Sequence, residues 1–226
     1  MNSNLTEILF ILDRSGSMDP LTEAAIAGFN EFLRDQTAES GLARLTLVLF
    51  DDQYEVPVSS LPLPEIIPLD VSTYVPRGST ALLDAIGRGV DELGTKLAAL
   101  PEPDRPGKVI VAILTDGEEN ASRHFDWQQI SARIRHQTNV YGWNFLFLGA
   151  NQDTIATAAK MGIAAQNSAT YLADPAGYGA TTASLGRKMK AIRKQGTALL
   201  SAEEQADLAA PMDQIVQDED RKRRGK

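Results

Sequence analysis

Hydrophobic residues along this chain follow two alternating patterns, short apolar runs and longer helical repeats. The runs at 8–12, 45–50, 109–114 and 143–148 are typical of strands buried on both faces, as in the middle of a parallel sheet. Helical repeats separate these runs along the chain. The alternation predicts βαβ units and an α/β fold with a mostly parallel sheet.

The helical repeats differ in strength. The clearest steps by three and four residues through Leu83, Ile86, Val90, Leu93, Leu97 and Leu100. Weaker repeats predict helices near 21–33, 127–134, 153–160 and 185–192. Ser201, followed three residues later by Glu204, has the spacing of a capping box and predicts one further helix over 201–216.

A second kind of strand is expected at the edges of the sheet. Residues 54–58 follow the run at 45–50 after a short turn, and so short a link permits only an antiparallel neighbour. Pro57 suits an edge strand, where a missing N–H group is tolerated. Another edge strand is expected near 164–169, and the proline-rich stretch 61–76 is predicted to be a surface connection.

Composition limits the kind of protein. The chain has 226 residues, 43% of them apolar, no cysteine and a net charge of −8. The missing cysteines exclude disulfides and thiolate metal sites, and the acidic balance disfavours nucleic acid as a partner. The first apolar run is too short for a signal peptide or a membrane span. We therefore expect a cytoplasmic protein with no membrane partner.

Side chains suited to a metal ion follow two of the apolar runs. Asp13, Ser15 and Ser17 come directly after the first run, and Asp116 follows the run at 109–114. Open α/β sheets bind ligands at the carboxyl ends of their strands. Carboxylate and hydroxyl oxygens are hard donors that suit Mg²⁺, Ca²⁺ or Mn²⁺.

Taken together, these segments predict one site. If the two strands are neighbours, their ends lie about 5 Å apart, and two carboxylates that close would repel each other without a cation. Thr80, at the start of the strongest helix, can reach the same edge. Each segment also has an ordinary reading: a polar turn at 13–17, a turn at Asp116, and a helix N-cap at Ser79 or Thr80.

The combined pattern resembles the metal-ion-dependent adhesion site (MIDAS) of von Willebrand factor A (VWA) domains. The resemblance covers roughly residues 6–169 and implies a complete ligand set, contributed directly or through water by Asp13, Ser15, Ser17, Thr80 and Asp116. It also implies a doubly wound, Rossmann-like sheet of six strands in the order 3-2-1-4-5-6, with strand 3 antiparallel. We assign 1–175 to a VWA domain and 176–226 to a C-terminal helical extension with a basic tail.

The resemblance implies a binding module of the simple intracellular type and not an enzyme. Two carboxylates roughly neutralise a divalent ion, and if one of them acts only through water the ion stays net positive. An octahedral ion then keeps at least one exchangeable position, which a carboxylate from a partner protein would complete well. Few charged ligands and retained waters favour Mg²⁺, although Mn²⁺ or Ca²⁺ would also fit. Some family members of this type work beside AAA+ ATPases, which makes an AAA+ ATPase system one candidate partner.

Two other functions, an enzyme and a nucleotide-binding protein, fit the sequence less well. A Mg²⁺-dependent phosphatase or phosphotransferase of haloacid-dehalogenase-like type also places an aspartate after its first strand. It needs a second aspartate two residues later, where this chain has Ser15, and a hydroxyl is a poor general acid at neutral pH. Nucleotide binding is disfavoured because neither phosphate-binding glycine motif follows the first strand.

Several residues near the predicted site have open roles. Asp84 is a candidate to orient a ligand hydroxyl or water, and Asn151 is a candidate for the rim of the site. Glu118, Glu119 and Asn120 either shape the rim of the site or favour the helix that follows them, and we expect the second. Further expectations are solvent exposure for Arg14 and Met18, a hairpin turn at Asp51 and Asp52, core positions for Trp127 and Trp143, and a solvated tail at 221–226.

Overall fold

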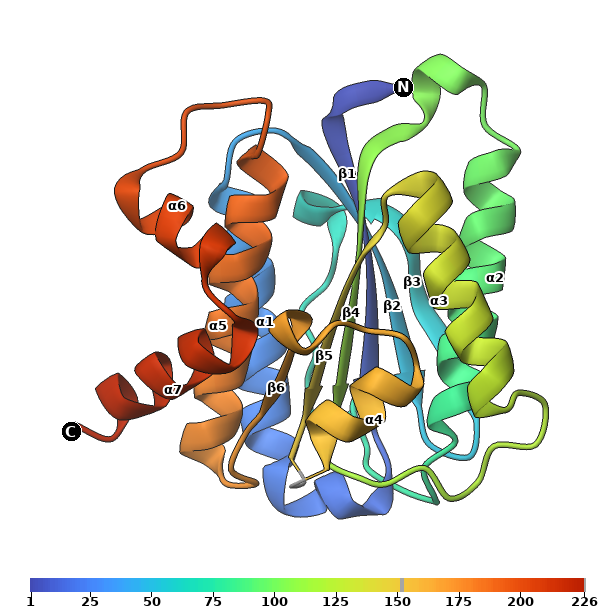
Figure 1. Cartoon of the computed structure of the whole chain (residues 1–226). Helices are drawn as coiled ribbons and strands as arrows, with labels where there is room; N and C mark the ends of the chain where they lie inside the picture. The colour runs from blue at the N-terminus through green and yellow to red at the C-terminus, as the bar shows by residue number, and fades with distance from the viewer. Residues whose placement is uncertain (151–152, 226) are drawn as a thin grey trace.

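The computed structural model describes residues 1–150 and 153–225, and in them a six-stranded sheet forms the centre of the molecule (Figure 1). Its order is β3-β2-β1-β4-β5-β6, with β3 antiparallel and the other pairings parallel. This is the predicted order and direction. The strands are β1 (Asn2–Asp13), β2 (Leu42–Phe50), β3 (Tyr54–Pro62), β4 (Pro106–Thr115), β5 (Asn144–Gly149) and β6 (Ser168–Thr170).

Helices cover both faces of the sheet, as Figure 1 shows. One face carries α1 (Thr22–Ala38), α5 (Pro175–Lys194) and α7 (Met212–Arg223), with α6 (Ala202–Ala209) beside α5. The other face carries α2 (Leu82–Ala98), α3 (Trp127–Tyr141) and α4 (Thr154–Lys160). Trp143 is buried in this second layer as expected, whereas Trp127 is half-buried at its margin.

The central strand β1 contributes to both hydrophobic layers because its side chains alternate between the two faces. Phe10 and its neighbours two residues away pack toward α1 and α5, while Leu9 and Ile11 pack toward α2. The ring of Phe10 lies 5.4 Å from Phe29 and 5.1 Å from Phe32 of α1. Burial on both faces explains why the run carries no polar side chain before Asp13.

The proline-rich stretch 61–76 is more than a surface connection. It buries Leu63, Ile66, Leu69 and Tyr74 in the layer that contains α1. Asn30 of α1 fixes its middle, because the Asn30 amide group donates to the Leu69 carbonyl and accepts from the Leu69 N–H, both at 2.8 Å. The expectation was wrong because prolines interrupt the periodicity that would have indicated these buried positions.

The C-terminal segment packs against α1, on the same face of the sheet. Leu185, Met189, Met212 and Val216 belong to the same hydrophobic cluster as Phe29. The predicted capping box at Ser201 is present, since the Glu204 N–H donates to Ser201 Oγ and Glu204 accepts from the Ser201 N–H. The single helix expected over 201–216 is wrong. It is two helices, α6 and α7, separated at 210–211, because Pro211 cannot continue a helix.

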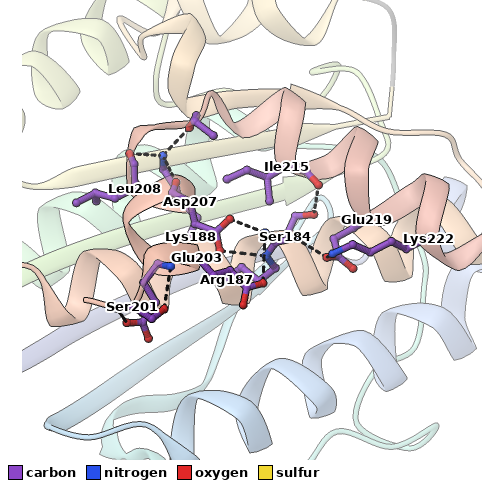
Figure 2. Close-up of polar contacts among 12 residues, drawn as sticks. Ser184, Arg187, Lys188, Ser201, Glu203, Asp207, Leu208, Ile215, Glu219 and Lys222 are labelled. Atoms are coloured by element: carbon purple, nitrogen blue, oxygen red, sulfur yellow. Dashed lines mark hydrogen bonds and ion pairs between the residues drawn. The ribbon is translucent and has the colours of Figure 1, made fainter. Parts of the chain in front are cut away.

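Polar contacts inside the C-terminal segment fix α6 and α7 against α5 (Figure 2). The Lys188 ammonium donates to three backbone carbonyls at the end of α6, those of Asp207, Leu208 and Ala210, at 2.8–2.9 Å. Arg187 binds both oxygens of Asp207 and one of Glu219. The helix end that would otherwise lack donors is thereby satisfied.

The basic tail is also engaged within the chain. Residues 221–223 form the last turn of α7. Arg224 binds Asp174 at the start of α5, with N–O distances of 2.7 and 2.9 Å, and Arg223 reaches Glu31 of α1 at 3.3 Å. The tail is solvent-exposed at 221–223 and 225, as expected, but it is helical and paired where a frayed end was expected. Within the described residues, none of the helices combines the length and hydropathy needed to cross a bilayer.

We predict that Lys188→Met lowers the free energy of unfolding by about 2–4 kcal/mol, because three carbonyls lose their donor in a buried position. Urea denaturation measures the change. The control is Lys222→Met, which removes a 62% exposed lysine paired with Glu219 and should cost less than about 0.5 kcal/mol. Equal losses for the two variants would contradict the assigned role of Lys188.

Candidate functional site

The candidate site lies at the carboxyl ends of β1 and β4. These two strands are parallel neighbours in register at Leu12 and Leu114. Asp13 and Thr115 end the two strands, and Asp116 follows directly. The expectation that the strands leading to Asp13 and Asp116 are neighbours is therefore confirmed.

A continuous chain of hydrogen bonds joins four of the five predicted site residues. Asp13 Oδ1 accepts from the Ser15 N–H at 2.7 Å. Ser15 Oγ and Ser17 Oγ are 3.1 Å apart, and Ser17 Oγ donates to Asp116 Oδ1 at 2.7 Å. The second carboxylate oxygen of Asp13, Oδ2, accepts from the Thr115 hydroxyl at 2.5 Å.

Thr80 is the fifth residue, and it approaches from the loop before α2. A Cβ built on Gly117 would lie 2.8 Å from Thr80 Oγ1 and 3.4 Å from Ser17 Oγ. The two hydroxyls therefore flank the same glycine, beside Asp116. Thr80 is not the N-cap of α2, because Ala81 occupies that position without a side-chain cap. The N-cap readings of Ser79 and Thr80 are thus both wrong.

The loop after β4 holds the start of α2. The Thr80 N–H donates to Asn120 Oδ1 at 2.9 Å, and the Leu83 N–H donates to Glu119 Oε2 at 2.9 Å. The Asp84 N–H donates to Ser122 Oγ at 3.0 Å. Glu119 therefore caps α2, which precedes it in the chain, and Asn120 holds the residue before the N-cap of α2. Neither caps the following helix, which corrects the expectation. The N-cap of α3 is Asp126, in a capping box with Gln129.

Asp84 has a different role from the one considered. Its two carboxylate oxygens accept from the N–H groups of Arg123, His124 and Phe125, each at 2.9 Å. It thus fixes the outer part of the same loop and its described contacts do not include a site hydroxyl. Asn151, the candidate for the rim, lies outside the described residues.

Burial raises the proton affinity of both carboxylates. Asp13 is fully buried, and desolvation raises its pKa from 3.8 to about 6 against the lowering effect of its hydrogen bonds. Desolvation also raises the pKa of Asp116. Both shifts mean that the surrounding hydrogen bonds do not fully offset the cost of removing these negative charges from water. A cation placed between the two carboxylates would offset this cost.

The donor chemistry fits a hard divalent ion. The cluster offers two carboxylates and three hydroxyls, oxygen donors of the type that Mg²⁺ and Mn²⁺ prefer. Gly117 leaves open the space beside Thr80 and Ser17 that a Cβ would fill. Among residues 1–150 and 153–225, no group of three or more His, Asp or Glu side chains is arranged to hold a metal.

Buried tyrosines bind the backbone at the two strand ends that carry the site, and the sequence pattern did not indicate them. The Tyr74 hydroxyl donates to the Asp13 carbonyl at 2.5 Å, and the Tyr171 hydroxyl donates to the Thr115 carbonyl at 3.1 Å. Tyr178 packs edge-on against Tyr171, with ring centroids 5.7 Å apart. No local motif marks these residues, because they come from three separate parts of the chain.

The expectation of exposure for Arg14 and Met18 is wrong. Met18 is fully buried in the α1 layer, and the Arg14 side chain is 5% exposed. Arg14 binds Asp51, the first residue of the β2–β3 turn, with its Nε 3.1 Å from Asp51 Oδ2. Asp51 also accepts from the Gln53 N–H at 2.6 Å, as a turn residue would. The turn reading was correct for Asp51 but omitted this buried ion pair.

Comparison with known proteins supports the fold. Comparisons with protein families and with curated proteins find no match. Among solved structures, proximal thread matrix protein 1 from the mussel byssus matches 82% of this chain and 46% of its own, at 14% identity and a TM-score of 0.55. A von Willebrand factor type A protein from Catenulispora acidiphila matches 82% and 42%, at 19% identity and a TM-score of 0.52.

A third solved structure is the manganese-loaded TRAP protein of Plasmodium vivax. It matches 76% of this chain and 70% of its own, at 14% identity and a TM-score of 0.53. This chain spans less than half the length of the mussel and Catenulispora chains. Similarity at this level of identity is a similarity of fold. The chain therefore has the VWA fold.

We predict that Gly117→Ala weakens Mg²⁺ binding by more than about tenfold, because the new methyl group would displace the Thr80 hydroxyl. Isothermal titration calorimetry measures the affinity. The matched control is Gly186→Ala in α5, where the nearest atom to a new Cβ is 3.8 Å away; its Mg²⁺ affinity should equal that of the wild type. Unchanged affinity in Gly117→Ala would show that Thr80 is not a ligand.

Proposed function

We propose that this chain is a divalent-cation-dependent protein-binding module with a complete MIDAS. Asp13, Ser15, Ser17, Thr80 and Asp116 would hold the ion, with Mg²⁺ as the first choice and Mn²⁺ or Ca²⁺ as alternatives. The observation that carries the proposal is the convergence of three hydroxyls with two carboxylates, Asp13 buried and Asp116 half-buried, both with a pKa raised by desolvation, at one edge of the sheet. The manganese-loaded TRAP structure, which shares the fold, agrees with this choice of ion class.

The arrangement of charges favours capture of a partner's carboxylate. The hydroxyls add no charge, and if one of the two protein carboxylates contacts the ion only through water, the ion keeps a net positive charge. Ser17 and Asp116 lie at the exposed side of the cluster, whereas Asp13 and Ser15 lie beneath. A ligand from outside would therefore approach next to Ser17 and Asp116. The metal, when bound, would supply a positive charge, and an aspartate or glutamate of the partner protein would complete its coordination shell.

A binding role also accounts better for the residues present than an enzymatic role. Ser15, at the position where a haloacid-dehalogenase-like phosphatase needs its acid/base aspartate, shares a hydrogen bond with Ser17. A serine hydroxyl is a weak general acid near neutral pH. We propose that the protein is not an enzyme, that residues 1–175 form the binding module, and that 176–226 form its helical extension.

The partner and the compartment are part of the proposal. We propose a partner protein that presents an acidic side chain, with an AAA+ ATPase system as one candidate. We also propose the cytoplasm as the compartment, because a chain of 226 residues without cysteine suits a reducing environment.

We predict that the wild type binds Mg²⁺ and that Asp116→Ala does not, because one of the two carboxylates is lost. The same variant should lose any partner that the wild type captures in Mg²⁺ and releases on addition of a chelator. Calorimetry measures the ion, and affinity capture with and without chelator measures the partner. Lys222→Met serves as a surface control.

A hydrolysis assay distinguishes the two kinds of function. Phosphate esters and nucleotides are incubated with the protein in Mg²⁺ and in Mn²⁺. We expect no turnover above the level of Asp13→Asn. Turnover that Asp13→Asn abolishes would overturn the binding proposal in favour of a phosphatase or phosphotransferase.

A further inference from the structure

A partly buried cluster of charges joins the two loops that carry three of the five proposed ligands. One loop follows β1 and contains Ser15 and Ser17, and the other precedes α2 and contains Thr80. Between them, directly after β2, lies Asp51, whose side chain is fully buried. A fully buried aspartate is uncommon unless it is paired, and this one is paired twice.

One oxygen of Asp51 serves both loops. Asp51 Oδ2 lies 3.0 Å from Arg14 Nη2 and 3.0 Å from Arg77 Nε. Glu55 completes the cluster from β3, with Oε2 2.9 Å from Arg14 and Oε1 2.6 Å from Arg77. Arg14 belongs to the first loop and Arg77 to the second. The cluster thus contains two cations and two anions and has no net charge.

Backbone hydrogen bonds connect the same three segments. The Arg14 N–H donates to the Phe50 carbonyl at 2.7 Å, and the Arg77 N–H donates to the Arg14 carbonyl at 2.9 Å. The Ala81 N–H donates to the Asp51 carbonyl at 2.9 Å. Arg14 is the residue after Asp13, and Ala81 is the residue after Thr80. Asp51 and its neighbour Phe50 are therefore hydrogen-bonded to the residues that directly follow two proposed ligands.

We propose that Asp51 is a positioning residue that keeps the two ligand loops in register before an ion binds. This inference depends on the function proposed above. Buried ion pairs add little net stability compared with apolar packing, but their geometry is specific. Each guanidinium contacts both Asp51 and Glu55, and such charge-assisted contacts restrict its orientation as well as its distance. Arg14 and Arg77 can satisfy Asp51 and Glu55 together only when the two loops are adjacent.

The test compares Asp51→Asn with Asp52→Asn, which makes the same charge change at the next residue. Asp52 is exposed, and within the described part of the chain its carboxylate has no hydrogen bond or ion pair. Calorimetry at a temperature well below unfolding measures Mg²⁺ affinity. Asp51→Asn should bind about 10–100-fold more weakly, as expected for loss of a residue that orients metal ligands, and Asp52→Asn should bind as the wild type.

Hydrogen–deuterium exchange of the metal-free protein supplies a readout that needs no ion. The amides of Arg14, Arg77 and Ala81 should be protected in the wild type and in Asp52→Asn, and should exchange faster in Asp51→Asn. If the wild type binds no Mg²⁺, the proposed function fails, and exchange alone then decides whether Asp51 holds the loops. A role in global stability alone would speed exchange throughout the sheet and leave the affinity of the folded protein unchanged.

A second variant covers the case in which Asp51→Asn does not fold. Arg77→Gln removes one of the two partners of Asp51 from the solvent side, where the Arg77 side chain is 45% exposed. It should fold, weaken Mg²⁺ binding at least several-fold and speed exchange at Ala81. Wild-type affinity together with wild-type exchange in Arg77→Gln or Asp51→Asn would overturn the inference.

Discussion

Asp13 ends the central strand with its carboxylate shielded from water, next to a second strand end that leads into Asp116. This burial of negative charge is the constraint on which the surrounding structure depends. The Ser15 N–H and the Thr115 hydroxyl both donate to Asp13, and Ser17 donates to Asp116. Even so, burial keeps the pKa of each carboxyl raised, which leaves room for a cation to add stabilisation.

Hydrogen bonds and ion pairs hold together the loops at this edge of the sheet. The loop after β4 holds the start of α2 through Glu119 and Asn120, and the cluster around Asp51 joins the loop after β1 to the loop before α2. Tyr74 and Tyr171 fix the carbonyls at the two strand ends. The site is therefore assembled from residues far apart in the chain, each held by a partner from another segment.

The sheet order and the grouping of the five candidate ligands could be predicted from the sequence. Apolar runs mark buried strands, and side chains that follow parallel strands must meet at one edge. The ion pair of Arg14 with Asp51 could not be predicted, because nothing in the local pattern near Arg14 indicates a partner 37 residues away. The same holds for the tyrosines and for the buried side of 61–76. The break at Pro211 was visible in the sequence, yet the capping box favoured a continuous helix.

The central claim is that these five residues hold a divalent ion. Crystals grown in Mn²⁺, which shares the oxygen preference of Mg²⁺, test it most directly through anomalous diffraction. The account predicts one strong peak at the carboxyl ends of β1 and β4, in contact with the hydroxyls of Ser15 and Ser17 and between Asp13 and Asp116. An ordered site without an anomalous peak, in crystals saturated with Mn²⁺, would contradict it.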